Sequence, residues 1–135
     1  MCKKLISLAL CIVMLFSFSV VASAEDDGVA PVFDYTNMTA TSILYSSGKF
    51  YCEASADGYS GITTKIEITM TLQKKGLLWW SKVESWSGTY NKSYATLSKS
   101  YATTKSGKYR VKAVYKVYSG SDSEKITSYT GEESI

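Results

Sequence analysis

The segment from Ile62 to Trp86 constrains the fold most, because its pattern is that of two β-strands joined by a tight turn. In its first half Ile66, Ile68, Met70 and Leu72 share one parity, and polar residues from Lys65 to Gln73 share the other. A period of two residues is typical of a strand with one buried and one solvated face. Lys74-Lys75-Gly76 predicts the turn, since glycine adopts a positive φ at little cost. The rest of the chain must therefore cover one apolar sheet face.

The return strand of this hairpin holds a conflict between its tryptophans and its charges. Regular alternation would place Trp80 and Trp86 on the same face as Lys82 and Glu84. Either that face contacts something, or a β-bulge near Ser85 turns Trp86 into the core. We favour the bulge, because aromatic side chains are mostly buried.

Other short segments carry strand patterns separated by serine- and glycine-rich turns. Strands are expected over 38–45, 50–56, 108–118 and 124–130, with one irregular edge strand within 89–104 whose inward residues are Ala95, Leu97 and Tyr101. Seven short strands without a helical period predict an all-β fold, a single antiparallel β-sandwich. A small barrel is the alternative.

The strand over 108–118 favours an immunoglobulin-like version of the sandwich. Gly107-Lys108-Tyr109-Arg110-Val111-Lys112-Ala113 is similar to the penultimate strand of that architecture. The immunoglobulin cysteine pair is missing, since Cys52 lies where the first would be and Ala113 lies near the second. The analogy therefore concerns architecture alone.

The first 24 residues have the pattern of a secretory signal peptide. Two lysines precede an apolar run over 5–21, and Ala22-Ser23-Ala24 supplies the small residues that signal peptidase recognises. We expect cleavage before Glu25 and a secreted, extracellular product without a membrane anchor; an uncleaved anchor is the alternative. Leu10 before Cys11 is too bulky for a lipoprotein site. Residues 25–36 are expected to be a disordered leader, and residues 37–135 the sandwich domain.

Cleavage would leave one cysteine, Cys52, so the mature domain cannot form an intramolecular disulfide. Cys52 shares parity with Phe50, Ala54 and Ala56, which predicts a small buried core residue rather than a reactive thiol. Loss of Lys3 and Lys4 leaves 13 basic against 12 acidic residues, a net charge of +1. The 111 remaining residues suffice for one hydrophobic core.

The absence of histidine from the sequence excludes triads built on a histidine base and histidine metal sites. Glu53 and Glu67 remain as paired carboxylates, on strands that could be neighbours, but nothing predicts the apolar pocket that a general acid needs. Asp57 to Gly61, and Asp122 with Glu124, lack the carboxylate density of a calcium loop and are expected to be solvated. We therefore expect no enzyme, no metal and no cofactor.

One strand offers a candidate binding face. Arg110, Lys112, Lys116 and Tyr118 share the polar parity of the strand over 108–118, and Trp80 and Trp86 of the hairpin could join them. Basic residues among exposed aromatics suit an anionic cell-wall polymer or a glycan. The alternative is an ordinary solvated face whose lysines discourage aggregation. No motif for binding nucleic acid accompanies it.

Four segments taken together resemble a functionally uncharacterised family of small secreted proteins from Gram-positive, clostridial-type bacteria. They are Gly48-Lys49, Thr71 to Lys74, Trp80 to Trp86 and Gly107 to Val111. The resemblance covers most of the mature chain and implies the sandwich fold and export, without an activity. A weaker likeness, in size, export and Trp/Tyr/Ser-rich β-character, is to bacteriocins of the lactococcin 972 type. Two functions are therefore expected: a secreted binding or interaction module, or alternatively a bacteriocin-like toxin.

Overall fold

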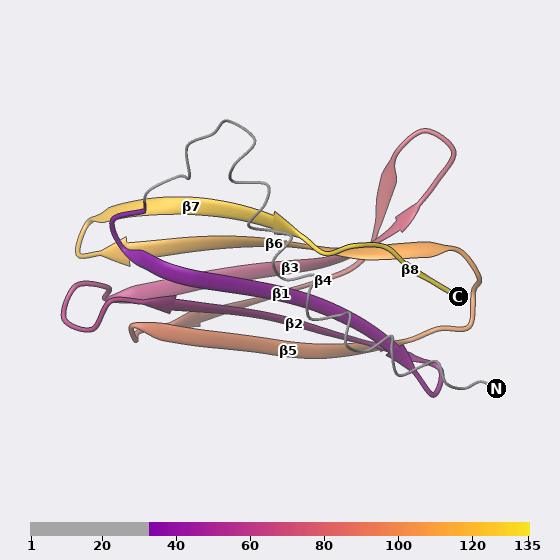
Figure 1. Cartoon of the computed structure of the whole chain (residues 1–135), viewed down its shortest axis with the longest axis horizontal. Helices are drawn as coiled ribbons and strands as arrows, with labels where there is room; N and C mark the ends of the chain where they lie inside the picture. The colour runs from indigo at the N-terminus through magenta and orange to yellow at the C-terminus, as the bar shows by residue number, and fades with distance from the viewer. Residues whose placement is uncertain (1–32) are drawn as a thin grey trace. The chain divides into compact units, whose positions relative to one another are not determined.

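The computed structural model describes residues 33–135, and these residues contain eight strands (Figure 1). In chain order they are β1 (Thr36–Ser46), β2 (Lys49–Gly58), β3 (Lys65–Lys75), β4 (Trp80–Tyr90), β5 (Tyr94–Ala102), β6 (Lys108–Ser119), β7 (Asp122–Tyr129) and β8 (Glu133–Ser134). The small sheet has the order β1-β2-β5. The large sheet has the order β4-β3-β6-β7, and β8 pairs with β6 beyond the end of β7.

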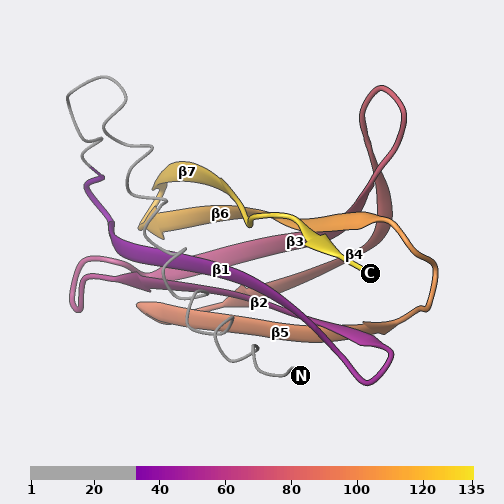
Figure 2. The ribbon, with the colours of Figure 1, turned by 45° about the vertical axis from the view of Figure 1, so that its right-hand side comes forward.

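The two sheets form an antiparallel β-sandwich, as the alternation predicts (Figure 2). A closed barrel is excluded, because the small and large sheets share no hydrogen-bonded pair of strands. The order is immunoglobulin-like, with the chain passing from β1 and β2 to β3, returning to the small sheet at β5 and ending at β6 and β7. The constant-type immunoglobulin fold instead has four strands in the first sheet and three in the second. Here β4 pairs with β3, which widens the second sheet.

The core lies between the sheets and consists of the apolar parities of four strands, β2, β3, β5 and β6. Its buried members are Phe50, Cys52, Ala54, Ala56, Ile66, Ile68, Met70, Leu72, Ala95, Leu97, Tyr109, Val111, Ala113, Tyr115 and Val117. The predicted inward residues of β5 are confirmed: Ala95 and Leu97 are buried, and Tyr101 packs against the core. β5 is also an edge strand, as expected.

Polar contacts at two places add to this packing. The Tyr115 hydroxyl donates to the Ala40 carbonyl at 2.8 Å and so links β6 to β1 across the core. At the start of β1, the Glu124 carboxylate accepts from the amides of Asp34 and Tyr35, both at 3.0 Å, and from the Thr36 hydroxyl. The end of the predicted disordered leader (25–36) is therefore ordered, because Tyr35 packs against the core and Thr36 begins β1. The expected signal peptide, and residues 25–32 of the leader, lie outside the described residues.

A β-bulge in β4 resolves the conflict between the two tryptophans. Leu72 pairs with Glu84 and Gln73 pairs with Lys82, so Val83 is the extra residue. Val83 and Trp86 both pack against the core although their parities differ, while Trp80 lies on the outer face opposite Lys75. The expected inward turn of Trp86 is confirmed, and the bulge lies at Val83 instead of near Ser85.

The chain ends in an element that the sequence did not indicate. The acidic stretch after β7 has no strand pattern in the sequence, but its residues Glu133 and Ser134 form β8, which pairs with the start of β6. Ile135 exchanges two backbone hydrogen bonds with Gly107, each of 3.0 Å, and its side chain packs against the core. The hydrophobic terminal residue explains why this segment folds back despite two preceding glutamates.

Candidate functional site

The outer face of the large sheet is the candidate site, because it concentrates basic side chains. Register places residues from four strands on this face, and within 33–135 their outward positions carry eight basic side chains and one carboxylate, Glu67. The basic residues are Lys65, Lys75, Lys82, Lys108, Arg110, Lys112, Lys116 and Lys125. This outer face is therefore strongly positive.

The basic residues gather in two clusters along the strands. Lys82, Gln73 and Arg110 form one row across β4, β3 and β6, with Lys112 in the next row. Lys116 and Lys125 face each other across β6 and β7 near the opposite end. Arg110 and Lys116 are six positions apart, which at about 3.4 Å per residue separates the clusters by about 20 Å.

The Arg110 side chain is fixed by contacts with two aromatic rings and by one side-chain hydrogen bond. Its guanidinium carbon lies 4.2 Å from the centre of the Trp80 ring and 4.3 Å from the centre of the Tyr129 ring. Its Nε donates to Gln73 Oε1 at 2.7 Å. Within residues 33–135, its two terminal nitrogens donate to no protein acceptor. We call this arrangement the Arg110 stack. It fixes a planar fork of donors that suits bidentate binding of a phosphate or carboxylate.

A glutamate near the first cluster partly neutralises the positive charge around it. Glu132 lies 3.7 Å from Lys75 and 4.0 Å from Lys108, and all three side chains are about half exposed. Such exposed ion pairs are weak and exchange readily with other partners. Lys82 and Lys112, next to the Arg110 stack, have no ion pair within the described part of the chain.

The second cluster combines tyrosine, lysine and glutamate. The Tyr118 hydroxyl donates to Glu67 at 3.0 Å, and Lys65 lies 4.2 Å from the centre of the Tyr118 ring. Lys116 is directly opposite Lys125, an arrangement that destabilises a sheet because like charges repel. An anion bound between them would remove that repulsion. Thr69, Thr71, Ser85 and Ser87 on β3 and β4 form a hydroxyl ladder that begins in the row of Lys112 and extends towards the second cluster.

Five of the six expected site residues lie on this face, and one does not. Arg110, Lys112, Lys116, Tyr118 and Trp80 point outward, whereas Trp86 packs against the core from the inner side. Sequence reasoning missed Gln73 and Tyr129, which complete the Arg110 stack. Tyr129 is the penultimate residue of the strand predicted over 124–130, so only the β6–β7 register, Lys112 opposite Tyr129, could have placed it beside Arg110.

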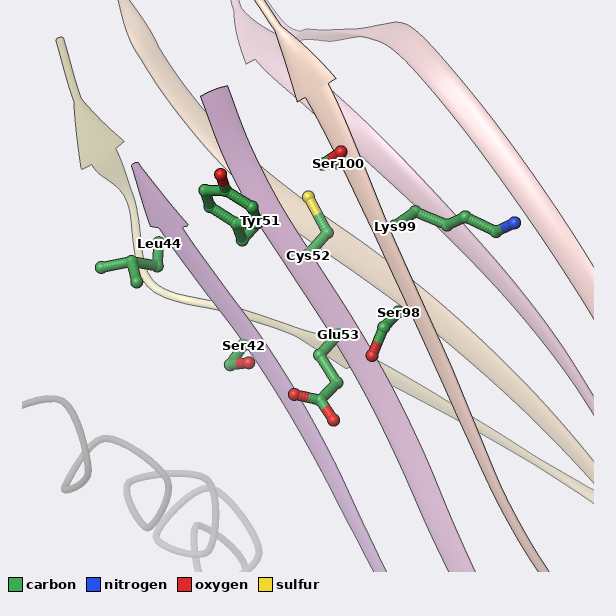
Figure 3. A pocket seen from close by; sticks show the side chains of 8 residues that line it. All are labelled: Ser42, Leu44, Tyr51, Cys52, Glu53, Ser98, Lys99 and Ser100. Carbon is green, nitrogen blue, oxygen red and sulfur yellow. The ribbon is translucent and has the colours of Figure 1, made fainter. Parts of the chain in front are cut away.

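The outer face of the small sheet has a different character. Its outward positions, taken over β1, β2 and β5, carry Glu53 and Asp57 but a single lysine, Lys49. A shallow hollow of about 430 Å³ lies there, between Leu44, Tyr51 and the serines of β5 (Figure 3). Cys52 lines it from beneath, but its side chain is buried and burial raises the pKa of its thiol to about 12. The thiol is therefore protonated and unreactive at neutral pH, as expected for a core residue.

The structure separates the two carboxylates that could have formed a catalytic pair. Glu53 lies on β2 in the small sheet and Glu67 on β3 in the large sheet, each on the outer face of its own sheet. The expectation that their strands could be neighbours is wrong, because the chain crosses between sheets after β2. Glu124, considered for calcium, instead accepts hydrogen bonds at the start of β1. Within residues 33–135 no three acidic or cysteine side chains are grouped as metal ligands would be.

Comparisons with known proteins add little to this description. A scan against protein-family models found no match, and no curated protein matches the chain. Among solved structures, the chain is similar to wild-type OgpA from Akkermansia muciniphila, with 10% sequence identity and a TM-score of 0.46. The match covers 76% of this chain and spans 31% of that structure. In the described part of the chain, no helix has the length and apolar character needed to cross a membrane.

Proposed function

We propose that the mature chain is a secreted, non-enzymatic binding module that holds an anionic polymer of the cell envelope on the outer face of its large sheet. The observation that carries this proposal is the Arg110 stack, which presents unpaired guanidinium donors beside Lys82 and Lys112. Holding an arginine between two rings reduces the entropy lost when it binds, so the stack is suited to recognition.

The faces of Trp80 and Tyr129 are already covered by cationic side chains, which favours an anion over a neutral glycan as the ligand. A sugar stacks on an open ring face, but Arg110 covers one approach to Trp80 and Lys75 lies 5.9 Å from the same ring. Arg110 also lies over Tyr129. These rings therefore serve mainly to orient cations. The ligand chemistry that matches oriented cations is phosphate or carboxylate.

The spacing of the two clusters favours a polymer over a small anion. A single phosphate can contact the Arg110 stack or the Lys116 and Lys125 pair, but it cannot span about 20 Å. A chain of repeating anionic units can contact both clusters and lie along the hydroxyl ladder between them. Each contact would be weak alone, and their combination would give useful affinity through a high effective concentration.

Cosedimentation with purified Gram-positive cell walls tests the proposal. We expect binding that decreases with added salt, because screening shortens electrostatic attraction to about 8 Å at physiological ionic strength. Chemical removal of the anionic wall polymers should abolish it. The triple variant Arg110→Gln/Lys112→Gln/Lys116→Gln should weaken binding about tenfold, at about 0.5 kcal/mol for each exposed charge, with an almost unchanged melting temperature.

The small sheet and the adjoining turn supply a matched control. Lys49, Lys92 and Lys99 are exposed lysines there, and their replacement by glutamine removes the same charge away from the proposed site. This control variant should bind walls like the unmodified protein. If both triple variants lost wall binding equally, the binding would depend on overall charge and not on the proposed face. Undiminished binding to walls stripped of their anionic polymers would refute an anionic ligand. Growth inhibition of neighbouring cells at low protein concentration would favour the toxin alternative.

A further inference from the structure

The loop between β3 and β4 carries an apolar surface that the sandwich does not use. Among the large hydrophobic residues of 33–135, Leu77, Leu78 and Trp79 have the highest exposed fractions, at 95%, 80% and 73%. Both views show the loop projecting beyond the two sheets (Figures 1 and 2). We call residues 76–79 the hairpin tip. Three adjacent exposed apolar side chains on a projecting loop mark a contact site rather than ordinary surface.

The residues that flank the hairpin tip are basic. Lys74 and Lys75 precede it, Lys82 follows it, and no acidic residue occurs between Lys74 and Lys82. Apolar side chains surrounded by lysines match the layers of an anionic bilayer, in which acyl chains lie beneath negatively charged phosphates. Tryptophan also favours the boundary between those layers, where its ring is partly apolar and partly hydrated.

The hairpin tip is held in shape by the residues beneath it. The Gly76 amide donates to the Trp79 carbonyl at 2.9 Å and closes the loop. The Ser81 hydroxyl donates to the Lys74 carbonyl at 3.4 Å, and Trp80 is fixed against Arg110. A loop already ordered loses little conformational entropy on insertion. Because the loop projects beyond both sheets, it can enter a deformable lipid surface without bringing the rest of the sandwich into the bilayer.

We propose that the hairpin tip is a membrane-contact site that inserts Leu77, Leu78 and Trp79 into an anionic bilayer, with Lys74, Lys75 and Lys82 at the lipid phosphates. This site shares Lys75 and Lys82 with the outer face of the large sheet, but Leu77, Leu78 and Trp79 lie outside that face, so membrane contact does not require polymer binding. The Arg110 stack lies at the base of the same hairpin. A protein inserted by its tip would therefore hold the first basic cluster close to the membrane surface.

Vesicle binding by the processed protein, purified from the medium of an expressing Gram-positive host, tests this site. The probes are vesicles of phosphatidylcholine mixed with phosphatidylglycerol and vesicles of phosphatidylcholine alone. We expect cosedimentation with the anionic vesicles and a blue shift of tryptophan emission as Trp79 leaves water. The variant Leu77→Ser/Leu78→Ser/Trp79→Ser should lose about tenfold or more in partitioning, since it removes the apolar side chains that would enter the acyl layer. Its fold should persist, because these side chains cover no core.

Two matched variants make the outcome decisive. Met38→Ser/Leu44→Ser/Tyr51→Ser removes three exposed apolar side chains from the small sheet and should leave vesicle binding unchanged. The triple variant of Arg110, Lys112 and Lys116 should keep the emission shift of Trp79 even where wall binding is lost. The proposal is overturned if the unmodified protein ignores anionic vesicles, or if the tip variant binds them equally well. A dimer that buries the tip and ignores vesicles would also overturn it.

Discussion

At the scale of single residues, two buried ionisable groups couple the stability of the sandwich to pH. Burial raises the pKa of the Cys52 thiol from 9.0 to about 12 and that of the Tyr115 hydroxyl from 10.0 to about 12. In the unfolded chain both groups release protons at lower pH than in the folded chain. The unfolded state therefore binds fewer protons in alkaline solution, and the free energy of unfolding decreases as pH rises.

The alkaline loss of stability can be measured by thermal melts between about pH 7 and about pH 11. We expect an unchanged contribution from these groups below about pH 9 and a progressive decrease in melting temperature above it, extending towards pH 12. Cys52→Ala should lower stability at neutral pH by about 1 kcal/mol, as a small cavity does, and should make the alkaline decrease less steep. A variant with the same alkaline slope as the unmodified protein would contradict the assignment.

At the scale of elements, the bulge at Val83 divides β4 into two parts with different roles. After the bulge, Trp86 packs against the core; before it, Trp80 lies outside over Arg110. Strict alternation would have given both tryptophans the same surroundings, because they are six residues apart. A single unpaired residue therefore allows one strand to supply both the core and the candidate site.

The two tryptophans should respond differently to truncation in urea denaturation experiments. Trp86→Ala should decrease the free energy of unfolding by about 2 to 4 kcal/mol, because it removes an aromatic ring from the edge of the core. Trp80→Ala should cost less than about 1 kcal/mol, since its contacts are on the outer face. Comparable losses from both substitutions would show that Trp80 has a structural role that its position does not indicate.

Alternation in the sequence was sufficient to predict most elements, and it failed where pairing depends on distant residues. Ile66 to Leu72 and Tyr109 to Val117 identified β3 and β6, because their apolar periods are long and unbroken. The turn predicted at Lys74 to Gly76 lies two residues too early: β3 continues through Lys75, and the Gly76 amide bonds to Trp79. β8 is too short to have a period of its own. It exists because Gly107 offers hydrogen-bonding partners to Ile135.

The candidate site was predictable only in part, for the same reason. The parity of β6 placed Arg110, Lys112, Lys116 and Tyr118 on one face correctly. The division of that face into two clusters, and the rings of Trp80 and Tyr129 around Arg110, depend on which strands are neighbours and in which register. Those facts belong to the assembled sheet, so no local pattern contains them.

At the scale of the whole molecule, charge is distributed unevenly between the two faces of the sandwich. Within the described residues, the outward positions of the large sheet hold eight basic side chains and one carboxylate, whereas those of the small sheet hold one lysine and two carboxylates. Binding to charged surfaces should therefore follow the local charge of one face more than the net charge of the protein.

Cation-exchange chromatography at neutral pH provides the corresponding measurement. Residues 25–135, the expected secreted product, have a net charge of +1, and this protein should be retained more strongly than that charge indicates because the basic face can orient towards the resin. Arg110→Gln/Lys112→Gln/Lys116→Gln should elute at clearly lower salt than Lys49→Gln/Lys92→Gln/Lys99→Gln, although both variants have the same formal charge. Coelution of the two variants would show that the asymmetry has no effect on adsorption.

The bulge at Val83 also has an evolutionary consequence. On its loop side, residues 76–79 pair with no strand, whereas residues on its far side are fixed by pairing with Met70 and Leu72. Selection can therefore alter the length and chemistry of the projecting loop while the sandwich is inherited unchanged. Diverging descendants of this chain should keep Trp86 and its alternating neighbours and should differ most between Gly76 and Trp79, so one scaffold could acquire new targets by drift at a single hairpin.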